Sequence, residues 1–385
     1  MNEADARSLI APEEHREEWC TRALEDAASI RDFGRDTPAT IEWAVRTGRY
    51  APVAGSGNTP SLWDLLAATA LRDVAAARVL EPHLDALGIL RQAEASVGAT
   101  DAGRDPLDLD TIGADAASSW GVFAAEGRGM RLEARETAGG WNLTGTKPWC
   151  SLASQLSHAL VTAFVGEERR LFAVALRAPT VRPHDGPWVA RGLPGIVSAP
   201  VDFDGAPAVP IGEAGWYLSR PGFAWGGMSV AACWYGGAIG VLDGLRTAAS
   251  SERADQVALV HLGRVDAALW AARATLREAA DVVDGRSGTP ARLVAERVRS
   301  AVAGAAGAAL AESDAALGPG PLVSDDAHAR RVADLHLYLR QHHGLRDAAR
   351  LGRMLVEHGA LRDERAVVEP EASAGIGKAD REARR

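Results

Sequence analysis

The stretch GWNLTGTKPWCSLAS, residues 140–154, carries the most informative pattern in the sequence. Its β-branched and aromatic residues predict a strand, and the Gly and Pro residues near its end act as turn signals. A large indole, Trp149, stands two positions before a small hydroxyl, Ser151. No other part of the sequence points so directly at a chemical role.

The composition is that of an ordinary globular protein: 47% of the 385 residues are hydrophobic and 24% are charged. The net charge of −9 argues against nucleic acid as a partner, because phosphate binding needs a cationic surplus. No apolar run approaches the roughly 20 residues of a membrane-spanning helix, and the N-terminus lacks the apolar segment of a secretory signal. The three scattered cysteines form neither a disulfide framework nor a metal-binding spacing. We therefore expect a cytoplasmic protein with no metal, nucleic-acid or membrane partner.

The pattern of hydrophobic and turn-forming residues changes twice along the chain and predicts a multi-domain α+β protein. Helical patterns fill the first segment, short apolar runs between Gly, Pro and Asp predict strands in the second, and long helices fill the third. The last segment has no apolar period, so we expect it to be disordered. The predicted segments are a helical domain (1–115), a β domain (116–215), a helical bundle (216–360) and a disordered tail (361–385).

Several local signals set the expected helix ends. Thr59 and Pro60 are typical of a helix start, whereas Pro82 should break or kink the helix that follows, so that a separate helix begins near Leu84. In the bundle, the Gly and Pro residues at 318–321 should end an alanine-rich helix, and Ser324 should cap the next one. The alanine-rich helix is flat enough to pack against another subunit, which predicts a homodimer or homotetramer.

The order of helices, strands and bundle, together with the opening motif, resembles the acyl-CoA dehydrogenase family of FAD-binding flavoproteins. The resemblance runs from about residue 12 to 358 and implies a helical N-terminal domain, a central β-barrel and a C-terminal four-helix bundle. The family motif G-W-x-L-x-G-x-K-x-W-[IC]-[ST] is matched by Gly140, Trp141, Leu143, Gly145, Lys147, Trp149, Cys150 and Ser151.

The resemblance implies an FAD site around this motif. Trp149 would pack on the flavin ring and Ser151 would donate to flavin N5, with Cys150 between them. The strand before the motif departs from the family pattern, but its residues from Phe123 to Glu126 would still supply backbone donors. The residues that remain from the family's other FAD contacts are Arg253, Gly318 and Gly320.

The resemblance also implies a substrate channel along an aromatic-rich stretch that contains Phe223 and Trp225. An alternative interpretation is that these rings only fill the joint between the β domain and the bundle.

The family's catalytic Glu is missing. One of its two places corresponds to residues 340–347, with His342 and His343, and the other corresponds to residues 224–233, with no acid.

Three functions follow from these matches. The first is FAD-dependent α,β-dehydrogenation of an acyl-CoA or related thioester by hydride transfer to flavin N5. His342 or His343 would then be the base, and an electron-transfer flavoprotein or oxygen the acceptor. The second is a flavin monooxygenase that resembles those acting on dibenzothiophene, in which His83, Ser151 and His342 or His343 hold a C4a-hydroperoxide. The third is an inactive relative that binds a thioester or a partner.

Overall fold

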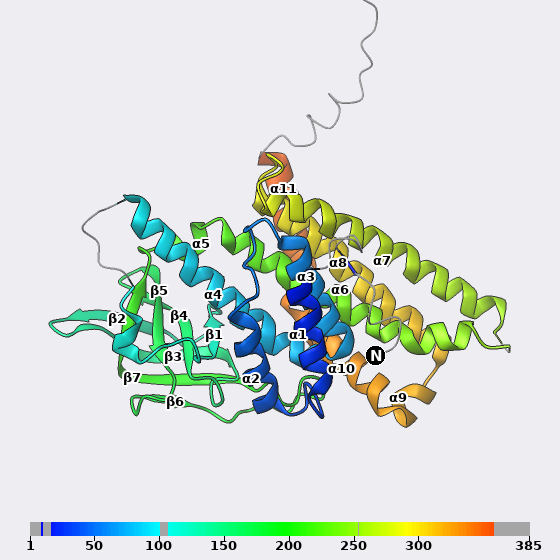
Figure 1. Ribbon diagram of the computed structural model, residues 1–385, viewed down its shortest axis with the longest axis horizontal. Helices are drawn as coiled ribbons and strands as arrows, with labels where there is room; N and C mark the ends of the chain where they lie inside the picture. Colours follow the sequence, from blue (N-terminus) through cyan, green and yellow to red (C-terminus); the bar gives the residue numbers. More distant parts are fainter. Residues whose placement is uncertain (1–8, 11–16, 101–106, 253, 358–385) are drawn as a thin grey trace, which may run out of the picture. The chain divides into compact units, whose positions relative to one another are not determined.

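The computed structural model describes residues 9–10, 17–100, 107–252 and 254–357 (Figure 1). The described residues up to His342 form one compact unit, and those from His343 onward form a second. The predicted disordered tail, 361–385, lies outside the described residues. The first unit contains both helices and a sheet, so the α+β class predicted from the sequence is confirmed.

Among the described residues, four α-helices precede the sheet: α1 (Glu18–Ser29), α2 (Thr37–Gly48), α3 (Thr59–Arg72) and α4 (Val74–Thr100). The 3₁₀ helix η3 (Leu109–Ile112) follows them. The helix α3 begins at Thr59 with Pro60 in its first turn, as predicted, and Asn58 occupies the N-cap position.

The predicted break at Pro82 is wrong, because α4 runs through this proline without interruption. Pro82 has no N–H to donate to the carbonyl of Arg78 four residues earlier, a loss that usually costs about 3 kcal/mol in a helix interior. The helix persists because α4 packs against β1 (Trp120–Phe123) on one side and against α2, α3 and α6 on others. Burial on several faces therefore outweighs the local preference of one residue.

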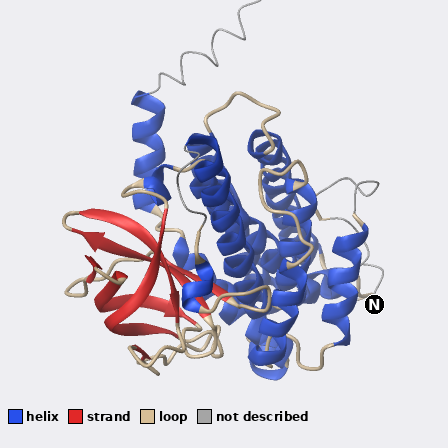
Figure 2. Ribbon diagram, turned by 60° about the vertical axis from the view of Figure 1, so that its left-hand side comes forward, coloured by secondary structure: helices blue, strands red, loops and turns tan. Residues whose placement is uncertain are grey.

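The remaining strands are β2 (Leu132–Thr137), β3 (Gly140–Ser151), β4 (His158–Val165), β5 (Glu168–Ala175), β6 (Val181–Pro183) and β7 (Ser198–Ile211). Neighbouring strands pair in the order β4, β2, β3, β7, β5, and β5 pairs with β4 again, so the pairing closes into a barrel (Figure 2). The strand β1 joins at β4, and β6 joins at β7. The opening motif therefore lies on a strand of this barrel, as predicted.

Six helices follow the barrel in the first unit: α5 (Trp216–Ser219), α6 (Gly222–Ala249), α7 (Gln256–Val283), α8 (Ala291–Leu317), α9 (Gly320–Ser324) and α10 (Asp326–Tyr338). The helix α6 contacts α3, α7, α8 and α10 and is the centre of this group. It is the one described helix long and apolar enough to cross a membrane, but 83% of its most apolar window is buried inside the protein, which is typical of a core helix.

The end of the bundle differs from the sequence prediction in two respects. The cap of α10 is Asp325 and not Ser324, since the Asp325 carboxylate accepts from the backbone N–H groups of Ala327 and His328. The helix expected to continue beyond Tyr338 is interrupted by a 3₁₀ turn, and α11 (Leu345–Glu357) belongs to the second unit. Gly344, with φ of +55°, precedes α11 in a conformation that a continuous helix does not contain.

The contact between α3 and α6 depends on Gly236. A Cβ atom at this position would lie 1.9 Å from the carbonyl oxygen of Ala67. Because this neighbour is backbone, it cannot move aside cheaply. We expect Gly236→Ala to lower the free energy of unfolding by about 3 kcal/mol, measured by urea denaturation.

The matched control is Gly263→Ala on the exposed side of α7, where an added Cβ meets nothing within 4 Å. Alanine should raise the stability of that helix by about 0.5–1 kcal/mol. Equal effects of the two substitutions would contradict the close packing of α3 on α6.

Candidate functional site

The backbone at Trp149 holds a bulky side chain in an uncommon conformation. The register between β3 and β7 shifts between Lys147 and Cys150, and Trp149 has φ of +58°. Left-handed backbone at a large side chain costs on the order of 1–3 kcal/mol and is concentrated at functional sites. The indole is 60% exposed. The protein therefore holds a flat aromatic ring toward solvent at a cost to its own stability.

The neighbours of Trp149 are fixed in the core. The Cys150 side chain is 1% exposed, and its Sγ donates to the Lys147 carbonyl at 3.3 Å. Leu152 is also buried with φ of +60°, and its N–H donates to the Val197 carbonyl at 2.8 Å. The Cys150 thiol thus points into the barrel, so only its backbone is available to a cofactor.

An ion pair with one buried end, the Lys147 ammonium, also holds this strand. Lys147 is 1% exposed, and its Nζ donates to Glu126 Oε1 at 2.9 Å and to Thr162 Oγ1 at 2.8 Å. Glu126 also lies 3.8 Å from Arg169, so its carboxylate already has two cationic partners. The Phe123 ring is 2% exposed and packs in the core. The structure therefore places the Phe123 ring in the core and pairs the exposed Glu126 carboxylate with Lys147 and Arg169.

The Ser151 hydroxyl lies in a short polar row. Its Oγ is 2.7 Å from Ser198 Oγ and accepts from Nη2 of Arg78 at 3.3 Å. The Ser198 hydroxyl also lies within donating distance of the Ile196 carbonyl, at 3.1 Å. If Ser198 donates to Ser151 instead of Ile196, the single proton of Ser151 is available to an incoming acceptor.

Arg78 connects this row to α4 and to a cavity. The guanidinium is buried, with Nη1 at 3.4 Å from Oε2 of Glu81, and it stacks over the Tyr338 ring with its centre 5.0 Å from the ring centroid. Glu81 is itself buried and lines the cavity. Two contacts of Arg78, both within hydrogen-bond distance, therefore connect the Ser151 hydroxyl to Glu81 in the cavity wall.

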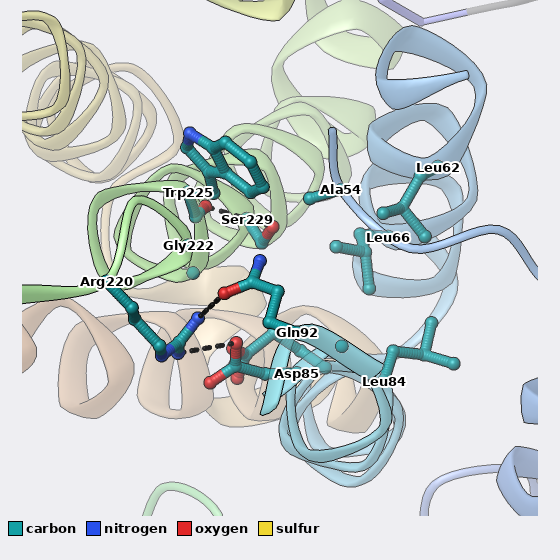
Figure 3. A pocket seen from close by; sticks show the side chains of 13 residues that line it. Ala54, Leu62, Leu66, Leu84, Asp85, Gln92, Arg220, Gly222, Trp225 and Ser229 are labelled. Carbon is teal, nitrogen blue, oxygen red and sulfur yellow. Dashed lines mark hydrogen bonds and ion pairs between the residues drawn. The ribbon is translucent and has the colours of Figure 1, made fainter. Parts of the chain in front are cut away.

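The cavity lies between α3, α4 and α6 (Figure 3), and the space in and around it, including the part that is open to solvent, is about 390 Å³. One side is apolar and the other is polar. Its lining comprises Ala54, Leu62, Leu66, Glu81, Leu84, Asp85, Gly88, Gln92, Arg220, Gly222, Trp225, Gly226 and Ser229. This mixture of apolar wall and few convergent polar groups is typical of a small-molecule site.

Arg220 organises the polar side of the cavity. Its Nη1 donates to Oε1 of Gln92 at 2.9 Å, and its Nη2 lies 3.7 Å from Oδ1 of Asp85 (Figure 3). The Nε of Arg220 is buried and has no hydrogen-bond partner among the described residues. A buried donor without a partner is costly, so this group favours a ligand that brings an acceptor.

Two carboxyl groups in this cavity have altered acidity. Burial raises the pKa of Glu81 to about 8; Arg78 and Arg299 oppose this rise and Asp85 adds to it. Burial also raises the pKa of Asp85, against the effect of Arg220. Glu81 therefore carries its proton at neutral pH and releases it in mildly alkaline solution.

None of the three histidines predicted from the sequence is among the residues that line the cavity. His83 is buried on α4, its Nδ1 accepts from the N–H of Trp120 at 3.3 Å, and it is not part of the cavity lining. Burial lowers its pKa to about 4, so it stays neutral near pH 7. His342 packs edge-on to Trp234 with ring centroids 6.2 Å apart. His343 belongs to the second unit, where its backbone N–H donates to Oδ2 of Asp347 at 3.0 Å.

The structure also gives the positions of most of the other residues predicted from the sequence. Trp225 lines the cavity, whereas Phe223 is 41% exposed and packs edge-on to Tyr217. Gly318, with φ of +62°, ends α8 and Gly320 begins α9, as expected from their turn signals. The predicted contact Arg253 lies outside the described residues.

Sequence reasoning missed the polar face of α4. Arg78, Glu81, Asp85 and Gln92 follow one another at spacings of three, four and seven residues, which places them on one helix face. Three charged residues on one face within an otherwise apolar helix were the available signal. It was overlooked because a break at Pro82 was expected between them.

The fold is similar to that of several solved structures, among them KijD3, TdsC and PigA. KijD3 in complex with FMN and dTDP-3-amino-2,3,6-trideoxy-4-keto-3-methyl-D-glucose is 18% identical, with a TM-score of 0.68 over 96% of this chain and 98% of that chain. FMN-bound TdsC from Paenibacillus sp. A11-2 is 15% identical, with a TM-score of 0.71 over 88% and 96%. The apo form of PigA is 15% identical, with a TM-score of 0.70 over 88% and 96%. At these identities the likeness shows the fold alone.

No protein-family model matches the sequence, and no curated protein sequence matches it.

The acidity of Glu81 has a measurable effect on stability. A carboxyl whose pKa rises on folding, here from 4.5 to about 8, contributes stability below pH 4.5 that is lost as the pH rises toward 8. The loss amounts to roughly 3–5 kcal/mol, from about 1.4 kcal/mol per pH unit. Glu81→Gln removes this titration. We therefore expect urea unfolding to show the variant gaining stability relative to the wild type between pH 5 and pH 8.5.

A difference between variant and wild type that stays constant over this range would mean that Glu81 is ionised in the folded protein at all these pH values. The matched control is Glu94→Gln, on an exposed position of the same helix, for which no such change with pH is expected.

Proposed function

We propose that this protein is a flavin-dependent oxidoreductase. The isoalloxazine would lie against Trp149, with the Ser151 hydroxyl at its edge, and the substrate would occupy the cavity between α3, α4 and α6. The observation that carries the proposal is the exposed indole at a left-handed backbone position, two residues before a hydroxyl in a polar row.

The residues present fit such a cofactor. A flat indole that is 60% exposed offers a stacking surface for a planar ring system. The Ser151 hydroxyl has one proton to donate, and Arg78 polarises it by donating to its oxygen. A bound flavin supplies electron or hydride transfer, which no side chain provides. Flavins bound to solved relatives of this fold, such as FMN in KijD3 and TdsC, support the assignment, and FAD remains the cofactor implied by the sequence resemblance.

Within this class we propose a monooxygenase. The two places where the resembling family carries its base hold His342 and His343 in one case and no acid in the other. A solved relative of this fold, TdsC, is described as a dibenzothiophene monooxygenase. The cavity is apolar on one side and small, which suits a compact, largely apolar substrate.

Dehydrogenation of an acyl thioester is a second candidate, favoured by one observation. The cavity does contain a carboxyl of raised pKa, Glu81, although on a helix that does not carry the base in the resembling family. As a carboxylate, Glu81 would accept a proton from a carbon next to a thioester carbonyl.

The two reactions differ in what they consume. A monooxygenase should consume oxygen when supplied with reduced FMN, and its oxidised flavin should keep its colour when acyl-CoA is added without oxygen. Bleaching of the oxidised flavin by any of a panel of acyl-CoAs under anaerobic conditions would instead establish the dehydrogenase.

Removing the stacking surface should weaken flavin binding without unfolding the protein. Stacking of a planar base on an aromatic side chain contributes about 1–3 kcal/mol, so Trp149→Ala should raise the dissociation constant for FMN or FAD about 10-fold. Titration of flavin fluorescence against protein measures this. The stability should change by less than about 0.5 kcal/mol, because the lost side chain is mostly exposed.

Trp270→Ala is the matched control, because Trp270 on α7 is 63% exposed and has no role in the proposed site. The proposal fails if neither FMN nor FAD binds the wild type, or if both substitutions change the affinity equally.

A further inference from the structure

Arg78 is the one described side chain that contacts both Ser151 and Glu81. Its Nη2 lies 3.3 Å from Ser151 Oγ, and its Nη1 lies 3.4 Å from Glu81 Oε2. The guanidinium is planar and rigid, so a movement of one nitrogen also moves the other. The hydroxyl assigned to the flavin edge and the carboxyl of the cavity are thus joined through a single rigid group.

Glu81 is the cavity carboxyl nearest to this connection. The second cavity carboxyl, Asp85, lies beside Arg220 instead of Arg78. Glu81 is enclosed by side chains from five helices. The titratable or charged groups that act on it or are affected by it are Arg78 and Asp85 on α4, Tyr217 on α5, Cys233 on α6, Arg299 on α8 and Tyr338 on α10.

We propose that Glu81 is the acid–base residue of the cavity and that Arg78 couples its charge to the Ser151 hydroxyl, an inference that rests on the function proposed above. Protonated Glu81 gives its proton to a basic atom of the ligand and becomes a carboxylate, and the ligand gains that proton. The reverse transfer restores the acid. This step needs no oxidant or reductant.

The two charge states of Glu81 have different consequences at Ser151. A charge-assisted hydrogen bond between a guanidinium and a carboxylate shortens to about 2.7–2.9 Å. From 3.4 Å, ionised Glu81 therefore draws Arg78 toward itself by about 0.5 Å. The contact from Nη2 to Ser151 is already 3.3 Å and would pass beyond hydrogen-bond range. Ser151 then loses the donor that polarises it, and it becomes a weaker donor to the flavin.

The same arrangement indicates the class of ligand. On the polar side of the cavity, Asp85 already faces a guanidinium, that of Arg220, and burial favours the protonated form of Glu81. This side offers the Glu81 hydroxyl and the buried Nε of Arg220 as donors. A small, uncharged, largely apolar ligand that carries a hydrogen-bond acceptor fits these groups, and a free carboxylic acid or quaternary ammonium compound does not.

The dissociation constant of FMN as a function of pH tests the coupling without knowledge of the substrate. In the wild type it should rise about 3- to 10-fold between pH 7 and pH 9.5, the effect of one weakened hydrogen bond. Glu81→Gln keeps the neutral form at every pH and should show tight, nearly pH-independent binding. Arg78→Lys lacks the rigid fork and should also lose the pH dependence, but with weaker binding.

Glu94→Gln is the control and should keep the wild-type profile, and ionisation of FMN itself is common to all four proteins. Infrared spectroscopy of the flavin-free protein provides a second readout, in which a protonated-carboxyl band should disappear above about pH 8 and be missing in Glu81→Gln.

If the wild type binds FMN but Glu81→Gln keeps the wild-type pH profile, or if the carboxyl band does not depend on Glu81, the inference is wrong and the proposed function stands. If no protein in the series binds flavin, the proposed function itself is wrong.

Discussion

A buried guanidinium must find partners on every side, and Arg78 meets this requirement in a way that organises the candidate site. It contacts a barrel hydroxyl, a helix carboxyl and the face of an aromatic ring at once. Removing any one of these would leave part of a buried charge uncompensated, which is far more costly than the contact is favourable. The position of Ser151 on β3 and the position of Glu81 on α4 are therefore fixed with respect to each other. The barrel and the helices up to His342 form one compact unit.

The sequence was sufficient for features that depend on neighbouring residues. The strand that contains Trp149 and Ser151, the strand at 158–165 and the end of α8 before Gly318 could be predicted because alternation, turn residues and helix stops act locally. The expected likeness to flavoprotein folds rested on the order of helices, strands and bundle together with a motif confined to one strand. The strained φ at Trp149 could not be predicted, since it arises from the register shift between β3 and β7, two strands about 50 residues apart.

Local rules failed where packing against distant segments decides the outcome. Pro82 does not end α4, because the surrounding elements bury the helix on both sides of the proline. Glu81 and Asp85 share a polar face of the same helix. This face becomes a wall of the cavity only because α6 packs against it, which the sequence of α4 alone does not show. His83 is held by the backbone N–H of Trp120 and kept neutral by burial, and its role at a substrate stays a prediction. From the residue types alone, a packed imidazole and a titrating carboxyl could not be told apart as candidate site residues.

The polar groups of the cavity are better explained by ligand binding than by stability. Buried ion pairs can commonly be replaced by apolar residues of similar size with no loss of stability, so a fold has no energetic need for Glu81, Asp85 and Arg220. Here the cost is greater still, because the pKa of Glu81 is raised by burial and the Nε of Arg220 has no partner among the described residues. These groups line an empty volume instead of closing on one another. A network with a purely structural role would be expected to satisfy its own donors, as Lys147 does with Glu126 and Thr162 inside the barrel. The two networks therefore differ: Lys147 finds partners in Thr162 and in the exposed Glu126, whereas the Nε of Arg220 has none among the described residues.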